Sequence, residues 1–469
     1  MKFTKFGKAL LLSAISAGIV LSVTSCVEDY TVGFLYVTGT VTAQSGGNGI
    51  ISGFKIDHNT GKLITVDGLP ISSGGANPVR AVLLTGSRFL YVLNRGVNAA
   101  GNGDCTTADP CGGSNITQFA VGGNGILTQQ EIFYTQGLNP FRLIADPSGN
   151  YLYVLDHDAI GADGKNPATP ANPGQGCALA LGSNVTSCGD ITAFSINSTT
   201  GRLQLIVNAQ VTAANGAALA YFPVPARPVD FVENGGYFLT LSATNQPASY
   251  PYTGGNTVFP YTLNGGSGQL TINQNSSQVL NDGSPSGVPS ATAIVAGSGT
   301  IYVLDNQPFT YNNSDGIPTT AASQILPYTV GTNGALQAEP GGVVPDDPTL
   351  ANPIYLLVES KGKFIYVANQ GNNAQGANAQ SGIAGYFLTT APAYQLSFIA
   401  GEPFGSGAGP QCLVEDPSDQ FIYSADFNDS AVNGRVVDPN SGVLNNLRVT
   451  TTYSLEGPAT WCLMDGRTG

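Results

Sequence analysis

The chain has 469 residues, of which 42% are hydrophobic and only 10% are charged, and its net charge is −13. So acidic a surface repels nucleic acid, which we therefore exclude as a partner. The 61 glycines and 29 prolines indicate many turns, while the apolar share is too high for a disordered chain. We expect a packed β protein.

Residues 1–25 have the pattern of an export signal. Lys2, Lys5 and Lys8 precede an uncharged apolar stretch over 9–23, which is short for a membrane span. The stretch leads into Val23-Thr24-Ser25-Cys26, which resembles the lipobox of bacterial lipoproteins. We expect cleavage before Cys26, a lipid on Cys26 and a linker over 26–33. The alternative is an ordinary signal peptide with an incidental cysteine.

The same resemblance bears on location. Val27 after the cysteine favours the outer membrane, so we expect an exported lipoprotein of the cell envelope. Loss of the three leader lysines leaves 14 basic residues against 30 acidic ones, a net charge of −16. No later apolar run approaches the length of a membrane span, so we expect membrane contact only through the lipid.

A strand motif recurs along the rest of the chain and sets its period. Its clearest copy is Asp146–Asp156, DPSGNYLYVLD, in which a polar turn precedes an apolar run of strand length. The first apolar residues of the seven copies are Phe34, Phe89, Tyr151, Tyr237, Ile301, Phe364 and Phe421. They lie 55 to 86 residues apart, a period typical of a propeller or solenoid.

Each repeat contains four predicted strands. After the motif strand at Phe89–Leu93, two strands at Asn115–Val121 and Leu127–Tyr134 flank a tight Gly/Asn turn. A strand at Phe141–Ala145 then follows a proline and leads into the next motif. Four antiparallel strands make a propeller blade, in which we label the proline strand A, the motif strand B and the next two C and D. The A-strand prolines are Pro78, Pro140, Pro228, Pro289, Pro353, Pro410 and Pro458.

The two ends of the repeat region are complementary. A B strand at Phe34–Val37 has no A strand before it, and an A-like segment at Pro458–Asp465 has no B strand after it. Pairing them would close the ring and remove two exposed edges. We therefore expect an all-β, seven-bladed β-propeller over residues 34–469.

Six cysteines remain besides Cys26, an even number that favours disulfides in an exported chain. Two local pairs each lie within one Gly/Asn-rich segment, and we expect both to be bonded: Cys105 with Cys111, and Cys177 with Cys188. Cys412 and Cys462 fall on neighbouring A strands. For them a third disulfide and two free buried thiols both remain open.

Long connections gather on one face of the expected ring. The B–C connections are long at 95–114, 157–189, 243–256, 306–323 and 370–381, whereas the A–B and C–D turns are short. All B–C connections of a propeller emerge on the same face, which we call the mouth. Loops on a rigid scaffold commonly carry function, so we expect the site there.

The repeated [FY]-[LI]-Y-V-x-[ND] strands resemble those of the lactonase-type seven-bladed β-propellers, the YVTN-repeat group that includes 6-phosphogluconolactonase-like proteins. The resemblance covers Phe34 to Gly466 and implies lactone hydrolysis. In that family, histidine and arginine motifs at A-strand starts line the channel mouth. The matching segments here, Pro78–Ala81, Pro140–Leu143 and Arg227–Asp230, keep arginines but no histidine.

The candidate catalytic group at the mouth is His157, flanked by Asp156 and Asp158, since imidazole and carboxylate can act as general base or acid. The candidate substrate-binding residues include Arg80 and Arg142, which can hold a carboxylate bidentately. B-strand ends supply the others, Asn94, Asp305, Asn369 and Asp426. The alternative for these Asn and Asp residues is a hydrogen bond to nearby turn backbone.

We expect no cofactor. The two histidines, His58 and His157, cannot form a three-histidine zinc site, and the chain has no nucleophile elbow, Walker or dinucleotide-binding motif. The remaining metal candidate is Ca²⁺ on Asp156, Asp158 and Asp163, because carboxylate oxygens suit a hard cation. Their spacing matches no established calcium loop.

Two functions compete. The resemblance implies a hydrolase of an unphosphorylated sugar or acyl lactone outside the cytoplasm, because a phosphorylated sugar lactone is an intracellular metabolite. The alternative is a non-catalytic module of the cell envelope that binds a glycan or a protein at the same mouth.

Overall fold

The computed structural model of the protein describes residues 30–41, 47–84, 86, 88–212, 216–243, 256–280, 290–297, 299–313, 315–372, 380–389 and 395–466. The export signal, the lipidation site at Cys26 and Pro289 lie outside the described residues. Among the residues that are described, no helix is long and apolar enough to span a membrane.

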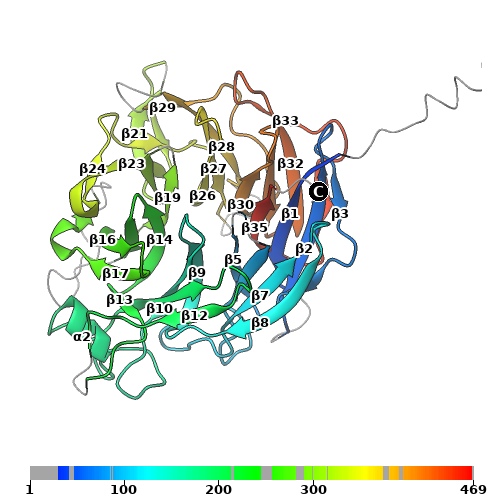
Figure 1. The fold of residues 1–469 in the computed structure, drawn as a ribbon. Helices are drawn as coiled ribbons and strands as arrows, with labels where there is room; N and C mark the ends of the chain where they lie inside the picture. Colours follow the sequence, from blue (N-terminus) through cyan, green and yellow to red (C-terminus); the bar gives the residue numbers. More distant parts are fainter. Residues whose placement is uncertain are drawn as a thin grey trace, which may run out of the picture.

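Within these residues, seven antiparallel sheets stand around a central axis, as predicted (Figure 1). Listed from strand A to strand D, blade 1 holds β5 (Pro78–Leu83), β6 (Phe89–Asn94), β7 (Asn115–Val121) and β8 (Leu127–Phe133); blade 2 holds β9 (Leu138–Ala145), β10 (Tyr151–Asp158), β11 (Gly189–Ile196) and β12 (Leu203–Ile206); blade 3 holds β14 (Pro228–Asn234), β15 (Tyr237–Ser242), β16 (Thr257–Asn264) and β17 (Gln269–Ile272). Blade 4 holds β19 (Ala291–Gly297), β20 (Thr300–Asp305), β23 (Gln324–Val330) and β24 (Leu336–Ala338); blade 5 holds β26 (Pro353–Val358), β27 (Phe364–Asn369), β28 (Gly382–Thr389) and β29 (Gln395–Phe398). Blade 6 holds β30 (Pro410–Glu415), β31 (Phe421–Asp426), β32 (Ala431–Val437) and β33 (Leu444–Asn446); blade 7 holds β35 (Ala459–Asp465), β1 (Thr31–Gly39), β2 (Ile50–Asp57) and β3 (Leu63–Thr65).

The outer strand is interrupted in five blades, which the sequence did not indicate. A second short segment there also pairs with strand C: β4 (Ile71–Ser72), β13 (Phe222–Val224), β18 (Gln278–Val279), β25 (Val344–Pro345) and β34 (Thr452–Ser454). The long B–C connections hold further structure, namely α2 (Gln175–Leu181) in blade 2 and the hairpin β21 (Phe309–Asn312) with β22 (Pro318–Ala321) in blade 4. Two 3₁₀ turns, η1 (Gln274–Ser276) and η2 (Thr332–Gly334), complete the described elements.

The ring closes as expected, because β35 pairs antiparallel with β1 from Phe34 opposite Asp465 to Val37 opposite Cys462. Figure 1 shows the red C-terminal strand beside the blue N-terminal one. The expected start at Pro458 is one residue too early, since Ala459 lies opposite Gly39 and takes the place that Pro78 takes opposite Asn94. Local sequence could not reveal this offset, because the register is set by the partner strand.

Every A strand bulges at its second residue, when the strand is counted from the residue opposite Asn94 or its equivalent in each B strand; in β9 that first residue is Pro140, opposite Asp156. In blade 1, Pro78 pairs with Asn94 and Arg80 with the next residue back, Leu93, so Val79 is left unpaired. The same shift occurs in all seven blades, at Val79, Phe141, Val229, Thr292, Ile354, Gln411 and Thr460. A bulge changes the direction of the side chains beside it. Here the bulge occurs at the equivalent position of every blade, so it affects equivalent side chains around the axis.

The core lies between the blades. Each of seven apolar clusters joins strands of two successive blades; for example, Leu35 and Phe54 of blade 7 pack with Tyr423 and Val432 of blade 6. Removing one blade would therefore expose apolar surface on both of its neighbours.

A tyrosine hydroxyl links successive blades across these clusters. The third residue of the B-strand motif donates a hydrogen bond to the carbonyl of the C–D turn glycine in the next blade. The bonds run from Tyr36 to Gly125, Tyr91 to Gly201, Tyr153 to Gly268, Tyr366 to Gly442 and Tyr423 to Gly61, at 2.5 to 3.1 Å. Each of these glycines has a positive φ, between 67° and 81°, a conformation that costs other residues free energy.

Three disulfides are present. Cys105–Cys111 and Cys177–Cys188 confirm the two expected local pairs. Cys412 and Cys462 are also bonded, with Cα atoms 5.9 Å apart, which decides the pair that the sequence left open. This third disulfide joins β30 to β35, so it fastens the strand that closes the ring.

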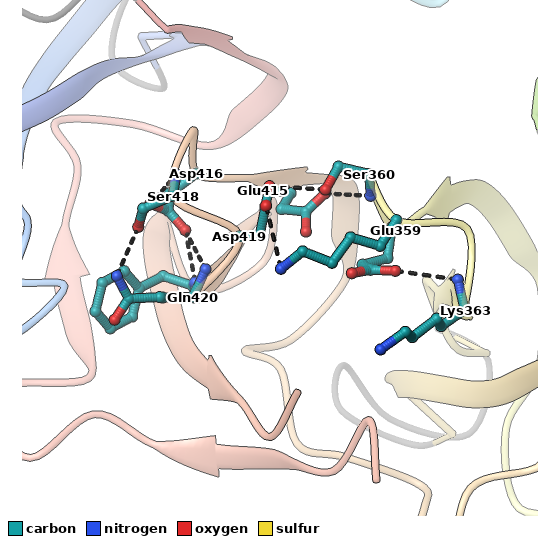
Figure 2. Close-up of polar contacts among 10 residues, drawn as sticks. Glu359, Ser360, Lys363, Glu415, Asp416, Ser418, Asp419 and Gln420 are labelled. Atoms are coloured by element: carbon teal, nitrogen blue, oxygen red, sulfur yellow. Dashed lines mark hydrogen bonds and ion pairs between the residues drawn. The ribbon is translucent and has the colours of Figure 1, made fainter. Parts of the chain in front are cut away.

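On the face opposite the mouth, the A–B turns of blades 5 and 6 are linked to each other (Figure 2). Glu415 accepts a hydrogen bond of 2.8 Å from the Ser360 amide, and Asp419 accepts one of 2.7 Å from the Ser360 hydroxyl. Asp416 stays within its own turn, where it accepts hydrogen bonds from the amides of Gln420 and Phe421. These polar turns hold neighbouring blades together at their other end.

The turn glycines yield a stability prediction. A Cβ on Gly61 would lie 2.5 Å from the Phe421 ring, whereas a Cβ on Gly149, whose φ of 69° is close to the 67° of Gly61, would meet nothing within 4 Å. We expect Gly149→Ala to cost about 1 kcal/mol of unfolding free energy through backbone strain. Gly61→Ala should cost about 1–3 kcal/mol more, because it also overpacks the blade interface. Urea unfolding of both variants measures the difference, and equal losses would contradict it.

Candidate functional site

A cavity of about 280 Å³ lies on the axis at the mouth. It is near the lower end of small-molecule sites, which span about 300–1,000 Å³. Most lining residues are the second or third residues of A strands, placed there by the repeated bulge. They are Val79, Arg80, Arg142, Thr292, Ile354, Gln411 and Thr460, joined by Gln370 and Phe427, which directly follow two B strands.

Arg142 is paired at the cavity wall. Its Nε lies 3.0 Å from Asp230 Oδ1, and the two side chains keep 22% and 10% of their surface exposed. Asp230 is the third residue of the next A strand, so equivalent positions of adjacent blades meet. Asp230 also accepts hydrogen bonds from the amides of Phe231 and Ile294. Much of the Arg142 charge is therefore neutralised within the protein.

Arg80 is held differently. Its guanidinium carbon lies 3.5 Å from the centre of the Trp461 ring, and Tyr355 contacts the same indole edge-on at 5.2 Å between ring centres. The indole is fixed in turn, because Trp461 Nε1 donates to the Ala81 carbonyl at 3.2 Å. Burial and the nearby charge of Arg142 lower the pKa of Arg80 below its ordinary value, while Asp230 and Tyr355 oppose that shift. No ion pair or hydrogen bond joins the Arg80 side chain to another described residue.

His157 lies at the rim of the site, one residue after Asp156 and within β10, which runs two residues past the expected strand end. Gln370 and Phe427 hold the equivalent place in their blades and line the cavity. The side chain of His157 is 35% exposed, and Nδ1 lies 3.1 Å from Asp158 Oδ2. Phe141 stands beside the imidazole, with 6.0 Å between ring centres, and the guanidinium carbon of Arg142 lies 5.2 Å from the centre of the same phenyl ring.

The Cys105–Cys111 loop of blade 1 holds Asp158. Thr107 Oγ1 donates to Asp158 Oδ1 at 2.8 Å, and Asn139 Nδ2 donates to Oδ2 at 2.7 Å. Burial alone would raise the pKa of Asp158, yet the hydrogen bonds from His157, Asn139 and Thr107 bring it below its ordinary value. Asp158 is thus a carboxylate that can orient His157.

The B-strand ends occupy a different place from the one expected at the channel mouth. Asn94, Asp156, Asp305, Asn369 and Asp426 are all 0% exposed. Asn94 bonds Ser73 and Asn115, Asp305 accepts from Gln324 Nε2 at 2.8 Å, and Asp426 accepts from Asn433 Nδ2 at 2.8 Å. The amide of Asn369 has no hydrogen-bond partner among the described residues. None of the five leaves surface for a ligand. Asn94, Asp156, Asp305 and Asp426 act as buried ties within their blades, close to the structural alternative.

Asp156 faces a second buried carboxyl. Asp190 lies opposite it on β11, and the Thr192 hydroxyl lies 3.1 Å from Asp156 Oδ2 and 3.4 Å from Asp190 Oδ1. Burial raises the pKa of Asp156 to about 7, and burial and repulsion by Asp156 raise the pKa of Asp190 well above its ordinary value. The pair therefore retains a proton at neutral pH, and Asp156 is removed from the solvent that a catalytic carboxyl would need.

The calcium candidates do not come together. The carboxylate of Asp163 accepts hydrogen bonds from the amides of Lys165 and Asn166, both at 2.9 Å, within its own turn. In the described part of the chain, no three His, Cys, Asp or Glu side chains form a group that could hold a metal ion. This arrangement does not support the calcium expectation for Asp156, Asp158 and Asp163.

Sequence reasoning missed the partners of the two arginines. Asp230, Tyr355 and Trp461 each occupy the third place of an A strand, the place of Arg80 and Arg142. Aligning the seven A strands by register would have found them. Asp190 was missed because only strand pairing brings it opposite Asp156.

The buried carboxyl pair yields a pH prediction. Unfolded aspartates ionise near pH 4, whereas the folded pair holds its proton up to about pH 7, so unfolding releases a proton between these values. Stability should therefore fall as the pH rises through this window, by up to about 1.4 kcal/mol per pH unit for each proton. Asp190→Asn imitates the carboxyl–amide pair of Asp305 and Gln324 and should flatten the decline. Thermal unfolding of the unsubstituted protein and of Asp190→Asn, measured between about pH 5 and 8, compares how their stability depends on pH. Parallel curves would refute the shared proton.

The matches with known proteins concern the same region. Residues 48–161 match the family model described as "Lactonase, 7-bladed beta-propeller", a stretch that contains Arg80, Arg142 and His157. Among curated proteins, none matches the chain significantly.

Several solved structures are similar over most of their length. A periplasmic gluconolactonase from Pseudomonas aeruginosa gives a TM-score of 0.59 at 16% identity, over 92% of this chain and 99% of that one. A putative 6-phosphogluconolactonase from Bacteroides uniformis gives 0.58 at 11% identity, over 93% and 100%. A hypothetical selenium-binding protein from Sulfolobus tokodaii gives 0.55 at 11% identity, over 93% and 94%. At such identities the structures show the fold, and with the family match they confirm the resemblance to the lactonase-type seven-bladed β-propellers.

Proposed function

We propose that the protein is a lactonase-type hydrolase that opens an unphosphorylated lactone outside the cytoplasm. One observation carries the proposal. A cavity of small-molecule size holds a guanidinium, that of Arg80, which has no acceptor among the described residues. The family match over residues 48–161, which include this arginine, supports the reaction class.

Hydrolysis adds a water oxygen to the lactone carbonyl and breaks the ring C–O bond, which leaves a carboxylate and a hydroxyl. Negative charge develops on the carbonyl oxygen, and the N–H groups of Arg142 that do not bond Asp230 or the Phe141 carbonyl can stabilise it. With Nδ1 of His157 donating to Asp158, Nε2 is left to accept the water proton and return it to the leaving oxygen. The ligand would extend from Arg80 past Phe141 to this rim.

The proposed location rests on several features. Three disulfides fit an oxidising compartment. The leader over residues 1–25, followed by Cys26 and Val27, supports an envelope lipoprotein at the outer membrane. A similar solved structure is described as periplasmic. A phosphorylated lactone would be scarce outside the cytoplasm, which is why the proposed substrate is unphosphorylated.

A second candidate is a non-catalytic module that binds a glycan or a protein at the mouth. One observation favours it: among the described residues that line the cavity, none is a histidine or a carboxylate. Such a wall can hold an anion without supplying a base to activate water.

An assay of the purified protein against sugar and acyl lactones decides between them. We expect turnover, and we expect His157→Gln to lower kcat by about 10²–10⁴-fold, the usual contribution of a general base. His58→Gln is the matched control, because His58 lies in the C–D turn next to β2, on the other face. Absence of turnover on every lactone would favour the binding module. Full activity of folded His157→Gln would remove this residue from the mechanism.

A further inference from the structure

We propose that Arg80 is the anchor of a carboxylate subsite, so that the substrate is a lactone bearing a free, singly charged carboxylate. That the ligand is a lactone substrate rests on the proposed function, whereas the binding of a carboxylate by Arg80 does not depend on it. Three features carry it: the orientation of Arg80, the charge balance around it and the composition of the cavity wall.

The Trp461 ring covers one face of the Arg80 guanidinium at 3.5 Å. Stacking satisfies the face of the planar group but none of its N–H donors, which lie in its plane. Because the indole is itself fixed by Ala81 and Tyr355, the guanidinium is held in one orientation before any ligand arrives. A fixed planar fork matches a carboxylate, which accepts two parallel hydrogen bonds.

Charge balance separates a carboxylate from a phosphate. Arg80 and Arg142 bring two positive charges to this layer of the channel, and Asp230 brings one negative charge that lies 3.0 Å from Arg142. The remainder is one positive charge. A carboxylate neutralises it, whereas a phosphate monoester, with a charge of about −1.5 to −2 at neutral pH, would leave excess negative charge in a partly buried site.

The rest of the wall suits a small polyhydroxy acid. Thr292, Gln370, Gln411 and Thr460 bring hydroxyl and amide groups, and Val79, Ile354 and Phe427 bring apolar surface. Mixed walls of this kind hold ligands that carry both hydroxyl groups and carbon faces. The cavity volume of about 280 Å³ limits the ligand to a small one.

The chain provides its own probe, because Trp461 is its only tryptophan. Three ligands share one sugar ring and differ at a single carbon: glucose is neutral, glucuronate is a carboxylate monoanion and glucose 6-phosphate is close to a dianion. We expect glucuronate to change Trp461 fluorescence saturably and to bind at least about tenfold more tightly than the other two, the effect of one charge-assisted hydrogen-bonded pair.

Variants assign the effect to Arg80. Arg80→Lys keeps the charge but loses the planar fork, and it should weaken glucuronate binding about tenfold. Arg80→Met should abolish glucuronate binding. Calorimetry is the readout for this variant, because the substitution changes the surroundings of Trp461 and so its fluorescence. Arg202→Gln is the control, because Arg202 is a surface residue paired with Glu131. Asp230→Asn should shift the preference toward glucose 6-phosphate by adding one net positive charge.

Equal binding of glucose and glucuronate, or unchanged glucuronate binding in folded Arg80→Met, would overturn the subsite. The hydrolase proposal fails separately. Lactone turnover without carboxylate binding would refute the subsite alone, whereas carboxylate binding without turnover on any lactone, including saccharic acid 1,4-lactone, would refute the hydrolase alone.

Discussion

The hydrogen bond from a B-strand tyrosine to the turn glycine of the next blade sets the spacing on which the rest of the structure depends. It recurs between five pairs of blades, and the bond from Tyr423 to Gly61 joins residues 362 positions apart and so helps to close the ring. Both partners are constrained: the tyrosine is buried, and the glycine must combine a positive φ with close contact to an aromatic ring. Because the blades are fixed at one height, the seven A-strand bulges also fall at one height.

The site arises where this repetition is broken. The third A-strand residues form a single layer around the axis, and a perfectly repeated chain would place seven identical side chains there. Instead the layer holds Arg80, Arg142, Asp230, Tyr355 and Trp461 in five of the blades. Opposite charges on adjacent strands pair, and the indole of the closing strand stacks on the remaining arginine. The closing strand β35 thus completes both the ring and the candidate site, and the Cys412–Cys462 disulfide fastens it beside Trp461.

The fold could be predicted from the sequence because its determinants are local and repeated. The DPSGNYLYVLD pattern, the A-strand prolines and the Gly/Asn turns each report on a few consecutive residues, and seven copies make them unambiguous. The two local disulfides were predictable for the same reason. The start of the last A strand was misplaced by one residue at Pro458, because strand pairing with Gly39 decides it.

The candidate site was only partly predictable. Arg80 and Arg142 were found from their place after a proline, but the difference between them was not, since it depends on Asp230 and Trp461, which lie 88 and 381 positions further along. From the sequence, the Asn and Asp residues at the B-strand ends were expected to be accessible at the mouth. In the structure, side chains of the D–A loops and C strands cover them. Exposure depends on what packs above a residue, and no local pattern contains that information.

The central claim is that the axial cavity is a ligand site organised by Arg80. A crystal structure of the protein soaked with glucuronate tests it most directly. The account predicts ligand density in the cavity, with the carboxylate lying across the edge of the Arg80 guanidinium while Trp461 still covers its face. A ligand bound elsewhere with the cavity unoccupied, or one whose hydroxyl groups rather than its carboxylate face Arg80, would contradict it.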